Sequence, residues 1–273
     1  MRDIAVHCTT FHDWSPGVRY AVQLAADAQA ALTGLYIGDR SARPPGPPLL
    51  VEEMAAYAQD ELQQAMLAGR AFADWAGRFG LHDARWQVAI GDAGAALGMA
   101  GDCNDLLVME LAGAPRQRAT LLLAEALVSG ATCLALPENC MAPGRVMRAA
   151  VAWNGTLASS RAVHAALPLL KRAQSVVLLQ PPSVDGGGPA HRWPLGRTAA
   201  QHLAAHEVPM VATEYVEGEG GIAAERLLAA ALAHRADLLV MGASVERRRG
   251  EHRFGRTTAG LLQRSPLPLL LRH

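Results

Sequence analysis

The pentapeptide DLLVM occurs twice in this 273-residue chain, at residues 105–109 and again at residues 237–241. The sequence that precedes it repeats as well, because IAVHCTT at 4–10 and AVAWNGT at 150–156 each lead into a long Ala-rich run. Self-similarity of this kind is typical of a chain built from duplicated structural units. We therefore interpret the chain as two copies of one unit.

Both copies also end in the same way. The first closes with ATCLALP at 131–137 and the second with SPLPLLLR at 265–272, so the duplication covers essentially the whole chain. The segment PENCMAPGR at 137–145 joins the two copies. We accordingly expect one domain at residues 1–140 and a second at residues 145–273.

Within each copy, short β-rich runs alternate with longer Ala/Leu-rich runs, which is the pattern of a parallel sheet with helices on both faces. The expected strands lie at 3–9, 33–37, 85–90, 105–109 and 132–136, and at 147–153, 175–179, 208–215, 237–241 and 267–271. Helices are expected between them, the longest at 51–78. The predicted fold is α/β, with two domains that each hold a separate five-stranded parallel sheet.

The two last strands are candidates for the place where the domains meet. Both are apolar, and the second carries Pro266 and Pro268, of a kind tolerated at the edge of a sheet. We expect these strands to lie across a pseudo-twofold interface inside one chain.

Composition limits the classes of function. Basic and acidic residues balance at 25 each, so no global field attracts nucleic acid or a membrane surface. The N-terminal MRDIAVHCTT lacks the apolar core of a signal peptide, and no apolar run is long enough to span a bilayer, which predicts a cytoplasmic protein. The four cysteines form no CxxC pair and are expected to be reduced. Lys171 is the single lysine, which excludes a GK[ST] phosphate loop.

Candidate binding residues gather at the expected carboxyl ends of the strands in the second copy, where ligands bind in open α/β sheets. Those ends carry Asn154-Gly155-Thr156, Gln180 and Met241-Gly242. Gly242 would allow backbone to approach a ligand, and Gly255 opens a helix whose amides and dipole favour an anion. The geometry of a phosphate site is plausible here, although glycines after a strand also occur in ordinary surface loops.

The chain resembles a tandem universal stress protein, with DLLVMG at 237–242, FGRTT at 254–258 and the closing LPLLLRH as matching segments. In ATP-binding members of that family, the fourth strand is followed by Gly, two residues, Gly, nine residues, Gly, and Ser or Thr. This sequence keeps the spacing and has Gly242 and Gly255, but Val245 and Arg256 stand at the other two positions. The resemblance implies two Rossmann-like or flavodoxin-like (adenine nucleotide alpha hydrolase-like) domains.

The resemblance also implies a site for ATP or another adenine nucleotide in the second domain. Asn154 stands where the family usually has an Asp that meets the adenine or ribose side. The implied binding residues are Asn154, Gly155, Gln180, Met241, Gly242, Gly255, Arg256, Thr257 and Thr258. No metal is expected beyond a Mg²⁺ that accompanies the nucleotide.

The two substituted positions predict an altered site. A β-branched residue tolerates positive φ poorly, so the loop at Val245 is expected to take another course. Arg256 falls at a helix N-terminus, where a cation is disfavoured without a negative partner. Two interpretations stay open: Arg256 contacts phosphate, with Thr257 or Thr258 supplying a hydroxyl, or it fills the pocket by pairing with a carboxylate. Arg247, Arg248, Arg249 and Arg253 would add an anion-attracting rim or form only a solvated face.

The first copy departs further from the family pattern. Thr9 takes the position of the family Asp, and Glu110 stands where the second copy has Gly242. Gly113 keeps the second glycine, but the loop to the next helix is about three residues shorter in our alignment of the repeats. A carboxylate repels phosphate. We expect the first domain to be a degenerate structural partner without nucleotide.

Two smaller patterns have ordinary explanations. His202 and His206 have the spacing of metal ligands on a helix but lack a clear third ligand, which favours a surface pair. Asp92 follows Gly91 and precedes a helical run, which predicts an N-cap.

The leading hypothesis is a stress-response protein that binds a ligand or unknown protein partners rather than turning over a substrate, as an intramolecular pseudo-dimer or as a homodimer of tandem chains. The alternatives are a nucleotide-free scaffold and, ranked last for want of a general base or metal carboxylate, a slow ATPase.

Overall fold

The computed structural model describes residues 1–38, 51–111, 116–138, 140, 142–182, 198–248 and 251–273. The first half contains β1 (Asp3–Cys8), α1 (Pro16–Ala28), β2 (Ala31–Gly38), α2 (Val51–Leu67), α3 (Gly69–Gly77), β3 (Ala84–Ile90), α4 (Ala93–Cys103), β4 (Leu106–Glu110), α5 (Arg116–Val128) and β5 (Cys133–Leu136). The second half contains β6 (Arg148–Ala152), α6 (Leu157–Leu170), β7 (Ser175–Gln180), α7 (Ala199–Ala205), β8 (Met210–Tyr215), α8 (Gly220–Ala233), β9 (Leu238–Gly242), β10 (Val245–Arg248), β11 (Glu251–Phe254), α9 (Arg256–Arg264) and β12 (Leu269–Arg272). All ten expected strands are present, each within two residues of its expected bounds.

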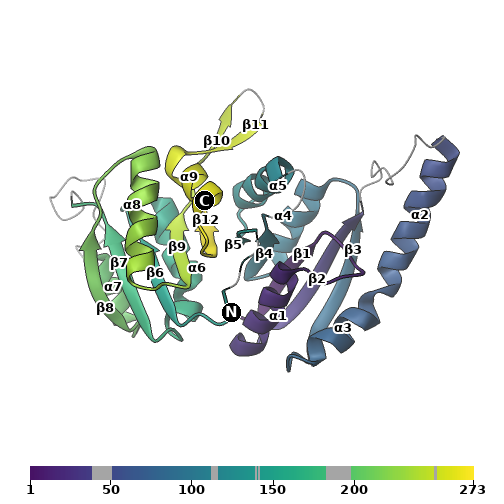
Figure 1. The fold of residues 1–273 in the computed structure, drawn as a ribbon, viewed down its shortest axis with the longest axis horizontal. Coiled ribbons are helices and arrows are strands. Elements are labelled where there is room, and N and C mark those ends of the chain that lie inside the picture. The colour runs from purple at the N-terminus through teal and green to yellow at the C-terminus, as the bar shows by residue number, and fades with distance from the viewer. Residues whose placement is uncertain (39–50, 112–115, 139, 141, 183–197, 249–250) are drawn as a thin grey trace.

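The ten strands form one sheet in the order β3-β2-β1-β4-β5-β12-β9-β6-β7-β8 (Figure 1). Pairing is parallel within each half, and β5 and β12 pair antiparallel at the junction. The mostly parallel α/β fold is confirmed, but the prediction of two separate sheets is wrong. In two separate sheets, β5 and β12 would each leave one edge without backbone hydrogen bonds. Pairing the two strands satisfies the amides and carbonyls of both edges. The expected meeting of the two last strands takes this form.

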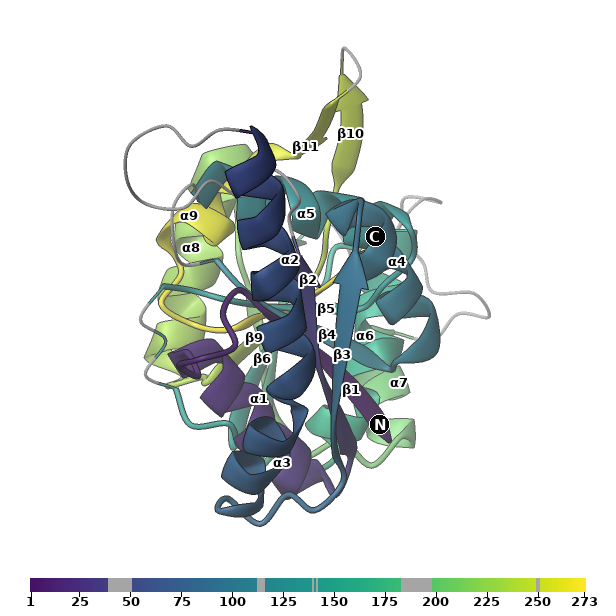
Figure 2. The same cartoon turned by 90° about the vertical axis from the view of Figure 1, so that its right-hand side faces the viewer.

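Helices cover both faces of the sheet. The apolar core on one face joins the sheet to α1, α3, α6 and α7, and the core on the other joins it to α4, α5, α8 and α9. The helix α2 lies at the outer end, beside β2 and β3 (Figures 1 and 2). Leu106 and Val108 belong to the first core, and Leu107 and Met109 belong to the second. A strand buried on both faces requires a continuous apolar run, which explains why LLVM recurs.

The repeated aspartate has one structural role in both halves. The Asp105 carboxylate accepts hydrogen bonds from the backbone amides of Arg2 and Asp3, at 2.5 and 3.3 Å. The Asp237 carboxylate accepts hydrogen bonds from the amides of residues 147–148, each at 3.1 Å. Each aspartate therefore holds the start of the neighbouring strand, β1 or β6, against the central DLLVM strand.

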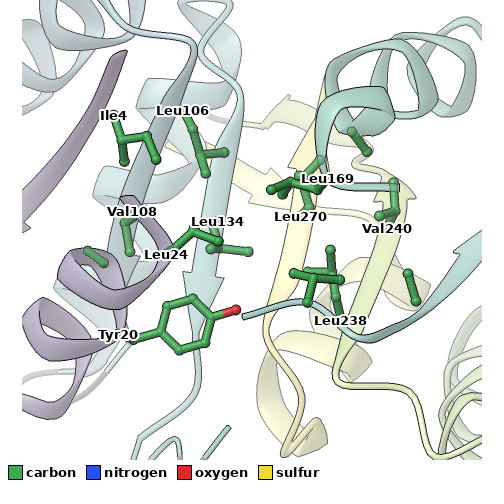
Figure 3. Packing of buried hydrophobic residues seen from close by; sticks show 14 of the residues in the cluster. Ile4, Tyr20, Leu24, Leu106, Val108, Leu134, Leu169, Leu238, Val240 and Leu270 are labelled. Carbon is green, nitrogen blue, oxygen red and sulfur yellow. The ribbon is translucent and has the colours of Figure 1, made fainter. Parts of the chain in front are cut away.

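Side chains of both halves continue one core across the junction. Leu134 of β5 and Leu270 of β12 are register partners and face each other, with Leu238 and Val240 of β9 behind Leu270 (Figure 3). Tyr20 of α1 is 2% exposed and points its hydroxyl toward the second half. No described residue forms a hydrogen bond with that hydroxyl.

The connection between the halves lies against α1. The backbone amide of Gly144 donates a hydrogen bond to Oε1 of Gln23 at 3.2 Å, and Arg145 forms an ion pair with Asp27 at 3.3 Å. A side chain at Gly144 would come within 2.5 Å of the Tyr20 carbonyl oxygen, so only glycine allows this approach. The segment is thus fixed to the first half before β6 begins.

The single long helix expected at 51–78 is divided into α2 and α3, which corrects that prediction. The indole Nε1 of Trp86 donates a hydrogen bond to the carbonyl oxygen of Ala65 at 2.7 Å. In a continuous α-helix that carbonyl would accept from the amide of Gly69. Trp86 of β3 therefore takes the acceptor at the point where the helix breaks. None of the described helices has the length and hydropathy of a membrane span.

Candidate functional site

A cavity of about 430 Å³ opens at the carboxyl ends of β6, β7 and β9. Of the nine residues implied as a binding site, it brings together eight: Asn154, Gln180, Met241, Gly242, Gly255, Arg256, Thr257 and Thr258. Gly155 is not among the lining residues and occupies a turn at φ 75°, a conformation that favours glycine. The structure thus places most of the implied set around one space, as expected for a site at the carboxyl edge of an α/β sheet.

Residues that the sequence reasoning missed form much of the wall. Trp153 and Leu179 contribute apolar surface, and Glu219 and Gly220 approach from the start of α8. The segment GEGG at 218–221 follows the expected strand at 208–215, so its glycines were a signal that could have located this wall. The cavity combines an apolar base with polar groups at its mouth, which is the usual composition of a small-molecule site.

Gly242 ends β9 directly against the first turn of α6. A Cβ atom at this position would lie 2.4 Å from the Ser159 backbone nitrogen and 2.6 Å from the Ala158 carbonyl carbon. Thr156 caps the same helix, because its hydroxyl accepts from the Ser159 amide at 3.3 Å. The Asn154 Oδ1 accepts from the Thr156 hydroxyl at 2.7 Å. Asn154 therefore orients the Thr156 hydroxyl that caps α6, and Gly242 allows β9 to pack closely against α6.

The N-terminus of α9 supplies unpaired backbone donors to the cavity. Gly255 is the N-cap and provides no side-chain acceptor, and the first backbone bond of the helix runs from the Ala259 amide to the Gly255 carbonyl at 2.9 Å. The amides of residues 256–258 precede that bond, so they belong to the turn that an α-helix leaves without internal acceptors. Such a helix end attracts anions.

The two threonine hydroxyls of this turn are engaged within the protein. The Thr257 hydroxyl donates to the Gly220 carbonyl oxygen at 3.1 Å, and the Thr258 hydroxyl accepts from the Ser244 amide at 3.4 Å. Thr258 is 2% exposed. These bonds tie α9 to α8 and to the end of β9, so the hydroxyls serve the shape of the cavity in this structure.

Arg256 is exposed at the first position of α9. Its side chain passes over Gly220, where an added Cβ would lie 3.3 Å from the Arg256 Cβ. No carboxylate of the described residues forms an ion pair with it. Glu219 lines the same cavity without such a bond. The carboxylate-filled pocket, one of the two interpretations left open by the sequence, is not seen in the described part of the chain.

Comparison with known families decides the identity of this half, because residues 146–273 match the model of the universal stress protein family. Residues 146–273 form a universal stress protein domain. Across almost the whole chain, the fold is similar to that of a universal stress protein from Archaeoglobus fulgidus, with 16% identity, a TM-score of 0.63, and 98% of this chain and 95% of that one covered.

A protein of unknown function from Pseudomonas aeruginosa is similar as well, with 14% identity, a TM-score of 0.56, and 99% and 92% coverage. Comparison with curated proteins gave no match. At these identities the structural likeness establishes the shared α/β fold of the whole chain and nothing finer.

The loop between β9 and α9 of the universal stress protein domain is a β-hairpin. Val245 begins β10 opposite Phe254 of β11, and both pack onto the core that α5 and α9 share. An extended strand suits a β-branched residue, which explains how the chain accommodates valine here. The hairpin rises beyond the sheet and packs against α5 of the first half (Figure 1).

The arginines expected around the site belong to this hairpin. Arg247 and Arg253 are exposed, and neither lines the cavity. The side chain of Arg248 lies outside the described part of the chain. Arg249 lies outside the described residues. The two arginines whose side chains are described therefore do not contribute to the expected rim of the cavity.

The described residues of the first half contain no such hairpin, and the loop length differs from the expected one. Thirteen residues separate β9 from α9, whereas five separate β4 from α5, so the first loop is eight residues shorter rather than about three. Gly113 lies outside the described residues, and Thr9 is exposed just beyond β1.

Glu110 shows how the first half fills the equivalent corner. Its carboxylate lies against the first turn of α1, where a Cβ atom on Gly17 would come within 2.8 Å of the Glu110 Oε2. In the universal stress protein domain the glycine is Gly242, on the strand. In the first half the glycine is on the helix and the larger residue is on the strand. In both halves, therefore, the end of the strand packs closely against the first turn of a helix, α6 or α1, and only the position of the glycine differs.

Other predicted features have plain outcomes. Asp92 is the N-cap of α4 and accepts from the Ala95 amide at 2.7 Å, as predicted. His202 is 8% exposed, and its ring contacts those of His164 and His206 at centroid distances of 4.9 and 4.6 Å, so the expected surface pair is wrong. His202 is buried because it lies between the exposed His164 of α6 and the half-buried His206. The described residues contain no group of three or more side chains arranged to hold a metal.

All four cysteines are free thiols, in agreement with the sequence. Burial raises the pKa of Cys8 and of Cys133 to about 12, so neither is a nucleophile at neutral pH.

Proposed function

We propose that the chain is a ligand-binding protein of the stress response, and that its universal stress protein domain binds ATP or another adenine nucleotide without turning it over. The single observation that carries the proposal is the cavity at the carboxyl ends of β6, β7 and β9, which combines apolar surface with the open N-terminus of α9. A nucleotide has the same two chemical parts, a flat apolar base and an anionic tail.

The base would occupy the end of the cavity formed by strand residues. Trp153, Leu179 and Met241 supply apolar contacts there, and the buried Gln180 supplies an amide. An amide presents a donor and an acceptor side by side, which suits the edge of adenine. The carboxylate of Glu219 is an acceptor for ribose hydroxyls.

The phosphates would occupy the mouth, at α9. The amides of residues 256–258 point from a helix N-terminus, and its dipole favours negative charge. Arg256 adds an exposed guanidinium at the same turn. A bound phosphate would relieve the unfavourable placement of a cation at the positive end of a helix, which supports the interpretation that Arg256 contacts phosphate. A Mg²⁺ ion would arrive with the nucleotide rather than at a protein site.

The first half would act as a structural partner without nucleotide. Its Glu110 places a carboxylate near the corner that Gly242 leaves clear in the second half. The repeat of the strand order on both sides of the β5–β12 pair supports a tandem pair of universal stress protein domains joined as an intramolecular pseudo-dimer. Slow ATP hydrolysis is the weaker alternative, because Glu219 is the single carboxylate among the described residues of the cavity lining.

Calorimetric titration of ATP into wild type, Arg256→Ala and Arg85→Ala tests the proposal. Arg85 is exposed and pairs with Asp83 on β3, so its removal changes net charge equally but far from the cavity. We expect Arg256→Ala to weaken binding by about 1.5 to 3 kcal/mol, the scale of a charge-assisted hydrogen bond, and Arg85→Ala to leave it unchanged.

Tighter binding by Arg256→Ala would show that this side chain obstructs the pocket. Absence of heat in wild type and in Arg256→Ala, at concentrations that detect millimolar affinity, would reject nucleotide binding and leave a nucleotide-free scaffold. Chromatography of the supernatant after denaturing freshly purified protein gives an independent measure of bound nucleotide.

A further inference from the structure

A second cavity, of about 460 Å³, lies where the two halves of the chain meet. Its first-half lining includes Asp102 at the end of α4 and Thr132 just before β5. Its second-half lining includes His164 of α6 and Arg272 at the end of β12. The antiparallel β5–β12 pair brings these residues together, because it places the start of one strand beside the end of the other. The space therefore exists only because the halves share a sheet.

Arg272 is the dominant charge on the second-half wall. Its Nη1 donates a hydrogen bond to the Thr132 hydroxyl at 3.3 Å, and no described carboxylate lies within ion-pair distance. Burial lowers the pKa of the Arg272 guanidinium, and the nearby Arg161 adds to this effect, so the charge is only partly solvated and lacks a counter-charge. Partly buried charges in proteins are usually paired.

The neighbouring face of α6 adds further donors. His164 lies one turn beyond Arg161, and residues 164, 165 and 168 of that helix all line the cavity. Arg161 itself donates through Nη1 to the backbone oxygen of His273 at 3.1 Å. One guanidinium group, that of Arg272, and the imidazole of His164 thus line the cavity from two elements.

The first-half wall holds two aspartates and the N-terminal Met1. Asp105 already accepts from two backbone amides, so its carboxylate is committed to β1. Asp102 is exposed at the end of α4, in the last turn, where the helix dipole is negative. The cavity therefore combines a guanidinium, that of Arg272, on its second-half wall with the exposed carboxylate of Asp102 on its first-half wall.

We propose that this inter-half cavity binds a small polar metabolite. A compact anionic group, phosphate or carboxylate, is held by Arg272 beside Thr132, and an ammonium or hydroxyl group at the other end of the ligand donates to Asp102. The bound molecule contacts both halves and so adds to the cohesion of their junction. This site is separate from the proposed nucleotide cavity and does not depend on it.

Calorimetric titrations of inorganic phosphate, phosphoethanolamine and β-alanine into the full chain test the site. We expect wild type to bind phosphoethanolamine more tightly than inorganic phosphate, because phosphoethanolamine carries an ammonium that reaches Asp102. Arg272→Gln should weaken binding of both phosphate probes by about tenfold or more, as expected when a charge-assisted hydrogen bond is lost. Asp102→Asn should remove the advantage of phosphoethanolamine over inorganic phosphate. The stronger of phosphoethanolamine and β-alanine identifies the anionic group.

Two controls keep the result interpretable. Arg85→Gln removes one exposed positive charge far from both cavities and should leave all affinities unchanged. If Arg272→Gln fails to fold by circular dichroism, Arg272→Lys keeps the charge and should bind phosphate with an intermediate affinity. No binding of any probe to wild type at millimolar concentration would overturn the proposal. Loss of phosphate binding in Arg256→Ala with retention in Arg272→Gln would overturn it as well.

Discussion

Substitution of Gly242 by alanine should destabilise the protein strongly for so small a change. The added Cβ would lie 2.4, 2.6 and 2.9 Å from three backbone atoms of the first turn of α6. Ordinary carbon contacts begin at about 3.5 Å, so α6 or β9 would have to move by about 1 Å. Neither can move freely, because α6 packs along β9 and both lie in the core. We expect a loss of about 3 kcal/mol, the upper part of the range for overpacked cores.

The assay is urea unfolding followed by far-ultraviolet circular dichroism, with the free energy of unfolding compared at equal slope. Gly221→Ala is the matched control, because nothing lies within 4 Å of a Cβ at that position in α8 and its φ is not positive. That variant should equal wild type or gain up to about 1 kcal/mol. If Gly242→Ala unfolded at the same urea concentration as Gly221→Ala, the close approach of β9 to α6 would not be the reason for glycine there.

Three further perturbations test other parts of the structure. Tyr20→Phe should stabilise the protein by about 1 kcal/mol, because it removes a buried hydroxyl that no described residue satisfies; a loss of stability on urea unfolding would instead indicate a bridging water. The hydrogen bond from the Arg2 amide lowers the pKa of Asp105, so the ionised carboxylate stabilises the folded state above about pH 4, and this stabilisation is lost as the pH falls further. Asp105→Asn should therefore make the melting temperature less dependent on pH in this acidic range. Burial lowers the pKa of His7 to about 4, so the folded state resists protonation and stability falls as pH decreases from about 6.5 to 4; this costs about 3 kcal/mol, and His7→Gln should abolish it. A pH-independent wild type between those values would contradict the lowered pKa of His7.

The sequence predicted the strands well because each carries an apolar run that a buried parallel strand requires. The repeat of LLVM at 106–109 and 238–241 correctly placed two strands that are buried on both faces of the sheet. The hairpin β10–β11 escaped because its sequence is rich in arginine and glutamate, and Val245 and Phe254 alone mark its buried face. No local pattern distinguishes such a hairpin from an irregular loop.

The other differences between the sequence predictions and the structure arise from contacts between residues that are distant in the sequence. The break between α2 and α3 depends on Trp86, a residue distant in sequence that takes the Ala65 carbonyl. The union of the sheets depends on the β5–β12 register. For the candidate site, strand ends, glycines and the family resemblance together identified eight lining residues of one cavity, whereas the wall from α8 required knowledge of how that helix packs. Whether those residues bind a nucleotide remains a prediction.

The antiparallel pair β5–β12 has a consequence for variation between the two halves. If two identical chains met through this pairing, every residue would appear on both sides, and a glycine required at one corner would be imposed on the other. A single chain has no such constraint, and it holds Gly242 at one corner and Glu110 against Gly17 at the other. Because the partners are also covalently linked, dilution cannot separate them, and the pairing persists at any protein concentration. The covalent link between the halves thus allows their sequences to differ and also keeps β5 and β12 paired.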